Sequence, residues 1–175
     1  MYNKISIVGG PGTGKTTLSN KLSKVLGIEA THIDGIHHLP NWQIRDKEER
    51  DQMIRDVVAG PKWIIDGTYR HTLKDRFEAS DLIIFLDFSS FAQVRGILSR
   101  YRKGKNKEKP EIPGCEERMT KDFLFYTWNY RKNKRHYITD ELEKVDPKKV
   151  LVFKNRKMVN KWLETVEKKG EIDAI

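Results

Sequence analysis

Cysteine is nearly absent from this 175-residue sequence, in which Cys115 is the only one. A single cysteine cannot form a disulfide within the chain, so a reducing, cytoplasmic setting is expected. Long hydrophobic runs are also absent, because the apolar stretches extend over a handful of residues and a membrane helix needs about 20. The N-terminus enters a strand-like stretch directly and lacks the pattern of a signal peptide. We therefore expect a soluble protein with no membrane partner.

Positive charge is what the sequence has in excess. Its 34 Lys and Arg residues outnumber its 25 Asp and Glu residues, which gives a formal net charge of +9. Two kinds of partner fit this excess: a nucleic acid bound across a basic face, or a polyanionic small molecule bound in a cleft. The positions of the arginines decide between them, because a phosphate-handling enzyme gathers its arginines around one cleft.

Strand-like and helix-like patterns alternate along the whole chain. Apolar runs predict strands at 4–8, 29–33, 63–66, 81–87 and 150–153. Helical spacing predicts helices at 15–26, after Asp46, around Leu73 and Phe77, after Ser89 or Ser90, at 116–145 and near the C-terminus. Such alternation predicts one α/β domain over residues 1–175, with a parallel five-stranded sheet and helices on both faces.

A glycine-rich loop joins the first strand to the first helix and fits the pattern G-x-x-x-x-G-K-[ST]. Its glycines let backbone N–H groups surround a phosphate, and the helix that follows adds its positive dipole end. We expect Lys15 to reach the β- and γ-phosphates of ATP and Thr16 to bind Mg²⁺. The predicted ATP contacts here are Gly9, Gly10, Pro11, Gly12, Thr13, Gly14, Lys15, Thr16 and Thr17.

Over nearly its whole length the chain resembles the bacterial topology modulation proteins, within the adenylate kinase-like superfamily. Besides the P-loop, the resemblance rests on His32–Asp34, Trp63–Gly67, Phe85–Asp87, Pro113–Cys115 with Arg118, and Trp128–Arg131. It implies an adenylate kinase-like P-loop NTPase fold with a mobile lid. The implied activity is that of an ATP-dependent phosphotransferase, and the acceptor is left open.

The segment from Asp66 to Arg70 is similar to the D-G-F-P-R segment of adenylate kinases, although its Phe-Pro pair is missing. The resemblance implies that Asp66 lies near the metal ion and that Gly67 and Arg70 contact the acceptor, with Arg70 on its phosphate. The alternative is that Asp66 caps the end of a strand and that Arg70 lies in solvent.

Asp34 directly follows the second predicted strand, at the carboxyl edge of the sheet where ligands bind in such folds. Shikimate and gluconate kinases, which this chain also resembles, keep an aspartate here, and this implies that Asp34 accepts a hydroxyl proton or orients the acceptor. Trp42 follows in a loop and is expected to line the acceptor pocket or to fill the core. His32, His37 and His38 lack a nearby acid or thiol at persuasive spacing, so we expect local hydrogen bonds rather than a metal site.

Several basic residues resemble the nucleotide-covering positions of adenylate kinases. Arg95 and Arg100 correspond to arginines that reach over the adenine and the phosphates of ATP. The basic stretch at 100–118 is expected to be the lid. The loop containing Asn155 and Arg156 follows the last strand, where related proteins pass beside the adenine.

Two arginines interrupt an apolar face of the predicted helix at 116–145. Steps of three and four residues bring Arg131 and Arg135 onto one face with Leu124, Trp128, Ile138 and Leu142. Buried guanidinium groups need anions, which can be internal carboxylates or bound phosphates, and we favour phosphates in a cleft. Arg118 cannot share this face and is expected to act from the lid hinge.

The preferred function is a Mg²⁺-dependent kinase, monomeric or homodimeric, that transfers the γ-phosphoryl group of ATP to a nucleoside monophosphate. A hydroxylated metabolite is the second acceptor considered. A nucleic-acid-binding ATPase or regulator of DNA topology is possible but less favoured, because no known nucleic-acid motif is present. The predicted catalytic residues are Lys15, Asp34, Asp66, Arg100, Arg131 and Arg135.

Overall fold

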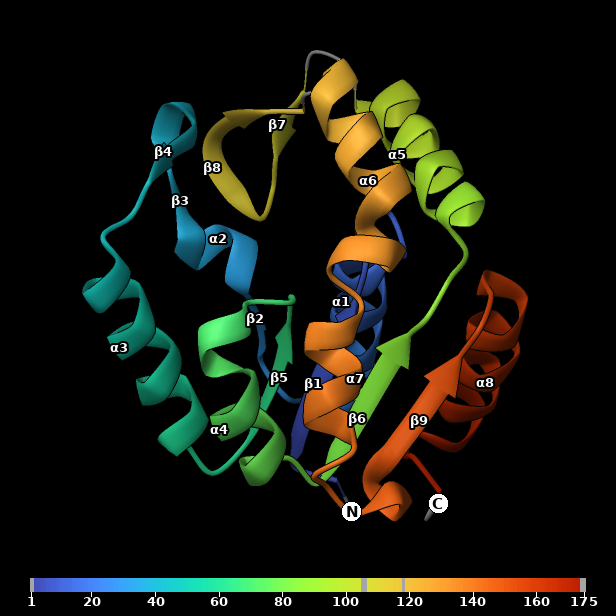
Figure 1. The fold of residues 1–175 in the computed structure, drawn as a ribbon. Coiled ribbons are helices and arrows are strands. Elements are labelled where there is room, and N and C mark those ends of the chain that lie inside the picture. The colour runs from blue at the N-terminus through green and yellow to red at the C-terminus, as the bar shows by residue number, and fades with distance from the viewer. Residues whose placement is uncertain (1, 105–106, 118, 174–175) are drawn as a thin grey trace.

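A five-stranded parallel sheet forms the centre of the computed structural model, which describes residues 2–104, 107–117 and 119–173 (Figure 1). All four strand pairings in this sheet are parallel. In spatial order the strands are β2 (Ala30–His32), β5 (Trp63–Asp66), β1 (Lys4–Gly9), β6 (Leu82–Leu86) and β9 (Val150–Phe153). β5 and β6 are buried along their whole length, as strands covered on both faces should be.

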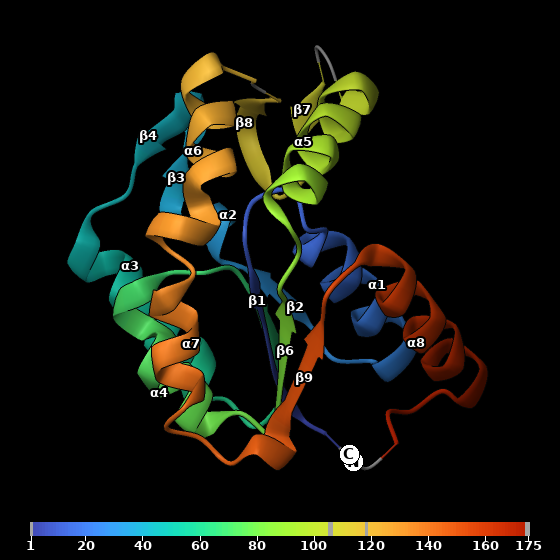
Figure 2. The same cartoon turned by 45° about the vertical axis from the view of Figure 1, so that its right-hand side comes forward.

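Helices cover both faces of this sheet (Figure 2). On one face, α1 (Lys15–Leu26) and α8 (Arg156–Lys169) share an apolar cluster with β1, β5 and β6. On the other, α4 (Leu73–Ala79) and α7 (His136–Leu142) pack on β1 and β6, and α3 (Lys47–Ala59) packs on β5. The predicted five-stranded α/β architecture is therefore confirmed. Within the described ranges, no helix is long and apolar enough to cross a membrane.

The remaining elements gather beyond the carboxyl ends of the strands (Figure 1). They are α2 (Ile33–His37), β3 (His38–Leu39), η1 (Pro40–Trp42), β4 (Gln43–Ile44), α5 (Ser90–Gly104), β7 (Glu108–Lys109), β8 (Ile112–Glu116) and α6 (Lys121–Asn133). Two short 3₁₀ turns, η2 (Arg70–Thr72) and η3 (Pro147–Lys149), complete the list. This edge of the sheet is where the P-loop also lies, so these elements surround the predicted site.

Within the stretch expected to be the lid, at 100–118, the described residues are partly helical and partly a β-hairpin. α5 continues to Gly104, and β7 then pairs antiparallel with β8. Pro110 and Glu111 form the turn of this hairpin, and the side chains of Ile112 and Cys115 in β8 are buried. Burial against the neighbouring η1 explains why a segment of polar composition has a regular structure here.

The prediction of a single helix at 116–145 is wrong, because the helix is interrupted between α6 and α7. At the break, the N–H groups of Lys134 and Arg135 both donate to the carbonyl of Tyr130. Lys134 leaves the helical region, with φ −132° and ψ −20°. The expected apolar face is also only partly correct, since Ile138 is buried but Trp128 is 55% exposed.

Candidate active site

The P-loop is held in a wrapped conformation by its own side chains and by two left-handed glycines. Gly12 and Gly14 have φ values of +69° and +93°, which favour glycine. The Nζ group of Lys15 donates to the carbonyls of Gly9 and Gly10, at 3.0 Å each. Thr13 donates to the carbonyl of Gly10 at 2.9 Å. Of the other predicted contacts, Pro11 and Thr16 are half-buried and Thr17 is exposed on α1. The loop thus has the shape and the cation that a phosphate chain requires.

Asp66, the last residue of β5, lies buried beside the P-loop helix. Its Oδ1 atom accepts from the Thr16 hydroxyl at 3.5 Å, and its Oδ2 atom accepts from Ser19 and contacts Nδ1 of His32 at 2.5 Å. Burial alone would lower the pKa of His32, but the hydrogen bond and the charge of Asp66 raise it. A hydroxyl and a carboxylate side by side are oxygen donors that suit Mg²⁺, so Thr16 and Asp66 fit this ion.

Sequence reasoning missed Ser19 and His32 as partners of Asp66. Ser19 lies three residues after Thr16 on α1, a spacing that brings both onto one helix face. His32 is paired with Asp66 in the register of β2 and β5. The helix spacing was a usable signal, whereas the strand register became visible only in the folded sheet.

Charged side chains from three other segments act electrostatically on Lys15. Burial lowers the pKa of Lys15, the carboxylates of Asp34 and Asp66 oppose this lowering, and the guanidinium of Arg100 adds to it. Asp34 is exposed in α2, and Arg100 donates from α5 to Glu117 at 2.9 Å. The structure therefore brings four of the six predicted catalytic residues into one electrostatic neighbourhood.

The β7–β8 hairpin rests on the segment that contains Trp42. The Trp42 N–H donates to Sγ of Cys115 at 3.2 Å, and Nζ of Lys109 lies 5.1 Å from the centre of the indole ring. Gly114 has φ +76°, and a Cβ there would lie 2.8 Å from Cβ of Pro40. This close approach joins the hairpin to η1. Trp42 is half-buried there, and its contact with an acceptor stays a prediction.

Gly67 and Arg70 occupy different surroundings after β5. Gly67 has φ +126°, and its carbonyl accepts from both terminal nitrogens of the fully buried Arg76 at 3.0 Å each. Burial lowers the pKa of Arg76 to about 10. Arg70 is exposed, and its guanidinium lies 4.5 Å from the ring centre of Tyr137 on α7. Contact between Arg70 and an acceptor stays a prediction.

The residues expected near the base of the nucleotide lie on α5 and at the start of α8. Arg95 is exposed on α5, where it lines a surface depression of about 370 Å³. Asn155 caps α8 by accepting the N–H of Met158 at 3.0 Å. Arg156 donates to the carbonyl of Gly12 at 2.9 Å, which places it beside the P-loop.

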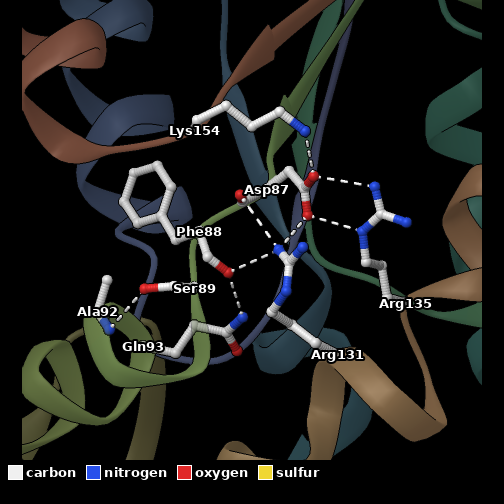
Figure 3. A network of polar contacts seen from close by, with 8 residues as sticks. All are labelled: Asp87, Phe88, Ser89, Ala92, Gln93, Arg131, Arg135 and Lys154. Atoms are coloured by element: carbon white, nitrogen blue, oxygen red, sulfur yellow. Dashed lines mark hydrogen bonds and ion pairs between the residues drawn. The ribbon is translucent and has the colours of Figure 1, made fainter.

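Arg131 and Arg135 share one internal carboxylate, that of Asp87 (Figure 3). Of the two alternatives left by the sequence, internal pairing is thus the one observed. Burial alone would raise the pKa of Asp87, but hydrogen bonds from Arg135 and Lys154 and the charge of Arg131 hold it well below its usual range. Sequence reasoning did not single out Asp87 or Lys154 for this role.

Two further expectations concern Arg118 in the lid and the histidines at 32, 37 and 38. Arg118 lies outside the described residues, as does part of the predicted lid at 100–118. Among the described residues, no three His, Cys, Asp or Glu side chains are grouped so that they could hold a metal ion between them, and this includes His32, His37 and His38. His37 instead hydrogen-bonds to Arg50 at 2.7 Å, in keeping with the local hydrogen bonding that we expected.

Comparison with known proteins agrees with this architecture. A protein of Thermococcus onnurineus (strain NA1) named "Putative adenylate kinase" is 33% identical over 89 residues, a match that spans 47% of each chain and so about half of that relative's length. A solved shikimate kinase from Bacteroides thetaiotaomicron has a TM-score of 0.57 at 15% identity, with 97% of this chain and 98% of that chain covered. A solved "putative kinase" from Chloroflexus aurantiacus j-10-fl has a TM-score of 0.52 at 16% identity, with 96% and 98% covered.

These structural likenesses concern the fold, which is that of an α/β P-loop NTPase. A family model described as "AAA domain" matches residues 4–162, which is most of the sequence. The chain therefore belongs to this AAA-domain family of P-loop proteins.

Proposed function

We propose that this protein is a Mg²⁺-dependent phosphotransferase that moves the γ-phosphoryl group of ATP to a small acceptor. The observation that carries the proposal is the buried Asp66 carboxylate beside Thr16 at the P-loop, with Asp34 and Arg100 in the electrostatic neighbourhood of Lys15. A phosphate-binding loop, a metal-binding carboxylate, an exposed second carboxylate and a further cation are the parts that phosphoryl transfer requires.

The roles follow from these positions. Lys15 and Arg100 stabilise the negative charge that spreads over the transferred group. Thr16 and Asp66 would hold Mg²⁺, which would supply positive charge against the β- and γ-phosphates when bound. The acceptor oxygen bonds to the γ-phosphorus as the bond to the β–γ bridging oxygen breaks, so that ADP leaves. If the acceptor is a hydroxyl, its proton passes to Asp34.

A nucleoside monophosphate is the first acceptor that we propose. The relative named "Putative adenylate kinase" supports it, as does the similarity of Asp66–Arg70 to the acceptor-binding segment of adenylate kinases. A hydroxylated metabolite is the second candidate. The position of Asp34, exposed and within the electrostatic neighbourhood of Lys15, favours that candidate because a hydroxyl nucleophile needs a base.

Two further proposals concern the surroundings of the enzyme. We place it in the cytoplasm as a monomer or homodimer. The resemblance to topology modulation proteins keeps a nucleic-acid-binding ATPase as a third alternative, supported by the net charge of +9. Salt-dependent DNA binding that ATP does not change would favour this third alternative over the kinase.

The test is an assay of ADP formation from Mg-ATP with a panel of nucleoside monophosphates and hydroxylated metabolites. We expect turnover that depends on one acceptor class and falls at least about 100-fold in Lys15→Ala, because the lost cation acts on the transferred phosphoryl group. Acceptor-independent hydrolysis, or no turnover with ATP still bound, would contradict the kinase proposal for the acceptors tested.

Asp34→Asn distinguishes the two acceptor classes. A phosphate acceptor is already ionised at neutral pH and needs no base, so kcat should change by less than about 10-fold. A hydroxyl acceptor loses its proton acceptor, so kcat should fall by about 100-fold or more.

A further inference from the structure

Asp87 binds three cations at the carboxyl end of β6 (Figure 3). Its side chain is 2% exposed and accepts from Nη1 of Arg131 at 2.5 Å, from Nε and Nη2 of Arg135 at 2.8 and 2.9 Å, and from Nζ of Lys154 at 2.5 Å. Arg131 comes from α6, Arg135 from the break before α7, and Lys154 from the loop after β9. We call these four residues the Asp87 cluster.

The Asp87 cluster has more positive charge than its own carboxylate can neutralise. Three cations and one anion leave two positive charges. The side chains of Arg131 and Arg135 are 35% and 32% exposed, and that of Lys154 is 59% exposed. Among the described residues, Nη2 of Arg131 and Nη1 of Arg135 donate no hydrogen bond. The cluster therefore retains donors and charge for an anion.

The Asp87 cluster is adjacent to the P-loop on two sides. Leu86, the residue before Asp87, pairs with Gly9 in the sheet. On the other side, Lys154 lies two residues before Arg156, which donates to the carbonyl of Gly12. The phosphates of a nucleotide on the P-loop would therefore enter the field of the cluster.

Gln93 provides a third link between the Asp87 cluster and the P-loop. Its Nε2 donates to the carbonyl of Phe88 at 2.9 Å, and Arg131 donates to that carbonyl at 3.0 Å. Its Oε1 lies 2.1 Å from where a Cβ on Gly10 would stand, so the side chain packs directly on the P-loop backbone. Gln93 is 1% exposed, which leaves this packing little freedom to change.

We propose that Asp87 is a positioning residue that holds Arg131, Arg135 and Lys154 beside the P-loop, so that they act on the terminal phosphoryl group of the bound nucleotide. Without the carboxylate, three like charges repel one another, and Arg131 and Arg135 lose their side-chain contacts with Asp87. The positive charge remains in the site, but its position is no longer fixed. This inference rests on the nucleotide-dependent function proposed above.

The test compares Asp87→Asn with Asp81→Asn, which removes an equal charge from the opposite end of the same strand. The Asp81 carboxylate accepts the N–H groups of Asn3 and Lys4, at 2.9 and 3.0 Å. The affinities of ADP and of a non-hydrolysable ATP analogue are measured with Mg²⁺ by calorimetry for both variants. The triphosphate preference is the affinity for the ATP analogue divided by the affinity for ADP. We expect Asp87→Asn to lower this ratio by about 5-fold, because the cations are no longer held beside the terminal phosphate. ADP affinity should not fall, because the site has gained net positive charge.

Kinetics give a second measurement for the acceptor identified in the panel assay. We expect kcat of Asp87→Asn to fall about 10- to 100-fold while KM for ATP rises by no more than about 5-fold, because positioning affects the transition state more than binding. Arg135→Lys, which keeps the charge but loses the two-pronged contact, should show part of the same loss and serves if Asp87→Asn does not fold.

Three results would overturn the inference. The first is an unchanged triphosphate preference in Asp87→Asn, and the second is a parallel loss of both nucleotide affinities, which indicates a merely structural role. The third is an equal effect in Asp81→Asn. A wild-type protein without acceptor turnover would refute the kinase function alone, since a lost triphosphate preference would still support the role of Asp87.

Discussion

Asp66 and Asp87 are both buried at the carboxyl edge of the sheet, but their partners give them different properties. Asp66 is surrounded by the hydroxyls of Thr16 and Ser19 and by His32, so its oxygens can turn to a metal ion. Both oxygens of Asp87 are paired with cationic side chains, so they are not placed to bind a metal ion. A buried carboxylate is stable only when it is paired in this way, so Asp87 should also contribute to folding stability.

At the residue scale, this pairing predicts a specific acid sensitivity. The pKa of Asp87 is depressed in the folded state, so its contribution is complete above the unfolded pKa of about 3.9 and is lost as the pH falls below it. We expect the free energy of unfolding to decrease between pH 5 and pH 3 by about 1 kcal/mol more in the wild type than in Asp87→Asn. Urea unfolding followed by tryptophan fluorescence measures this difference. The same pH dependence in both proteins would contradict it, and Asp81→Asn provides the charge-matched control.

At the element scale, α8 begins with a side-chain cap that coincides with a predicted nucleotide contact. The side chain of Asn155 accepts the N–H of Met158, so Asn155→Ala should destabilise the protein by about 1 kcal/mol. Asn160→Ala, an exposed position within the same helix, should be neutral or slightly stabilising because alanine is the better helix former. Thermal unfolding compares the two variants, and equal effects would show that the cap is unimportant. Titration with ATP of the same variants tests whether Asn155 also contacts the nucleotide.

Element boundaries were predictable where the signal is local and not where it depends on packing. The helix at 15–26 matches α1, and Asp46 caps α3 by accepting the N–H groups of Glu48 and Glu49. The break between α6 and α7 has no such signal, because apolar spacing continues through it to Ile138. The hairpin at β7–β8 was missed because its buried residues are few and are covered by η1 from another part of the chain.

On the scale of the whole molecule, α5 is docked directly on the P-loop. A Cβ on Gly96 would lie 2.0 Å from the carbonyl oxygen of Gly12, and a Cβ on Gly104 would meet only ordinary contacts at 3.6 Å. We therefore expect Gly96→Ala to displace α5 or the loop and to weaken ATP binding by about 10-fold or more. Gly104→Ala, in the same helix, should bind ATP like the wild type. Calorimetric titration distinguishes them, and equal affinities in all three proteins would show that this packing does not control the P-loop.

The sequence by itself determined the P-loop, the five strands of the central sheet with their intervening helices, and the sheet edge at which the site lies. These features depend on short patterns, namely glycine spacing and hydrophobic periodicity, that act within about 20 residues. Tertiary structure alone decided which anion the helix arginines meet and which partners hold Asp66. The contacts of Asp87 with Arg131, Arg135 and Lys154 join residues 44, 48 and 67 positions apart. Such pairs are set by how strands and helices pack, and no local pattern in the chain specifies them.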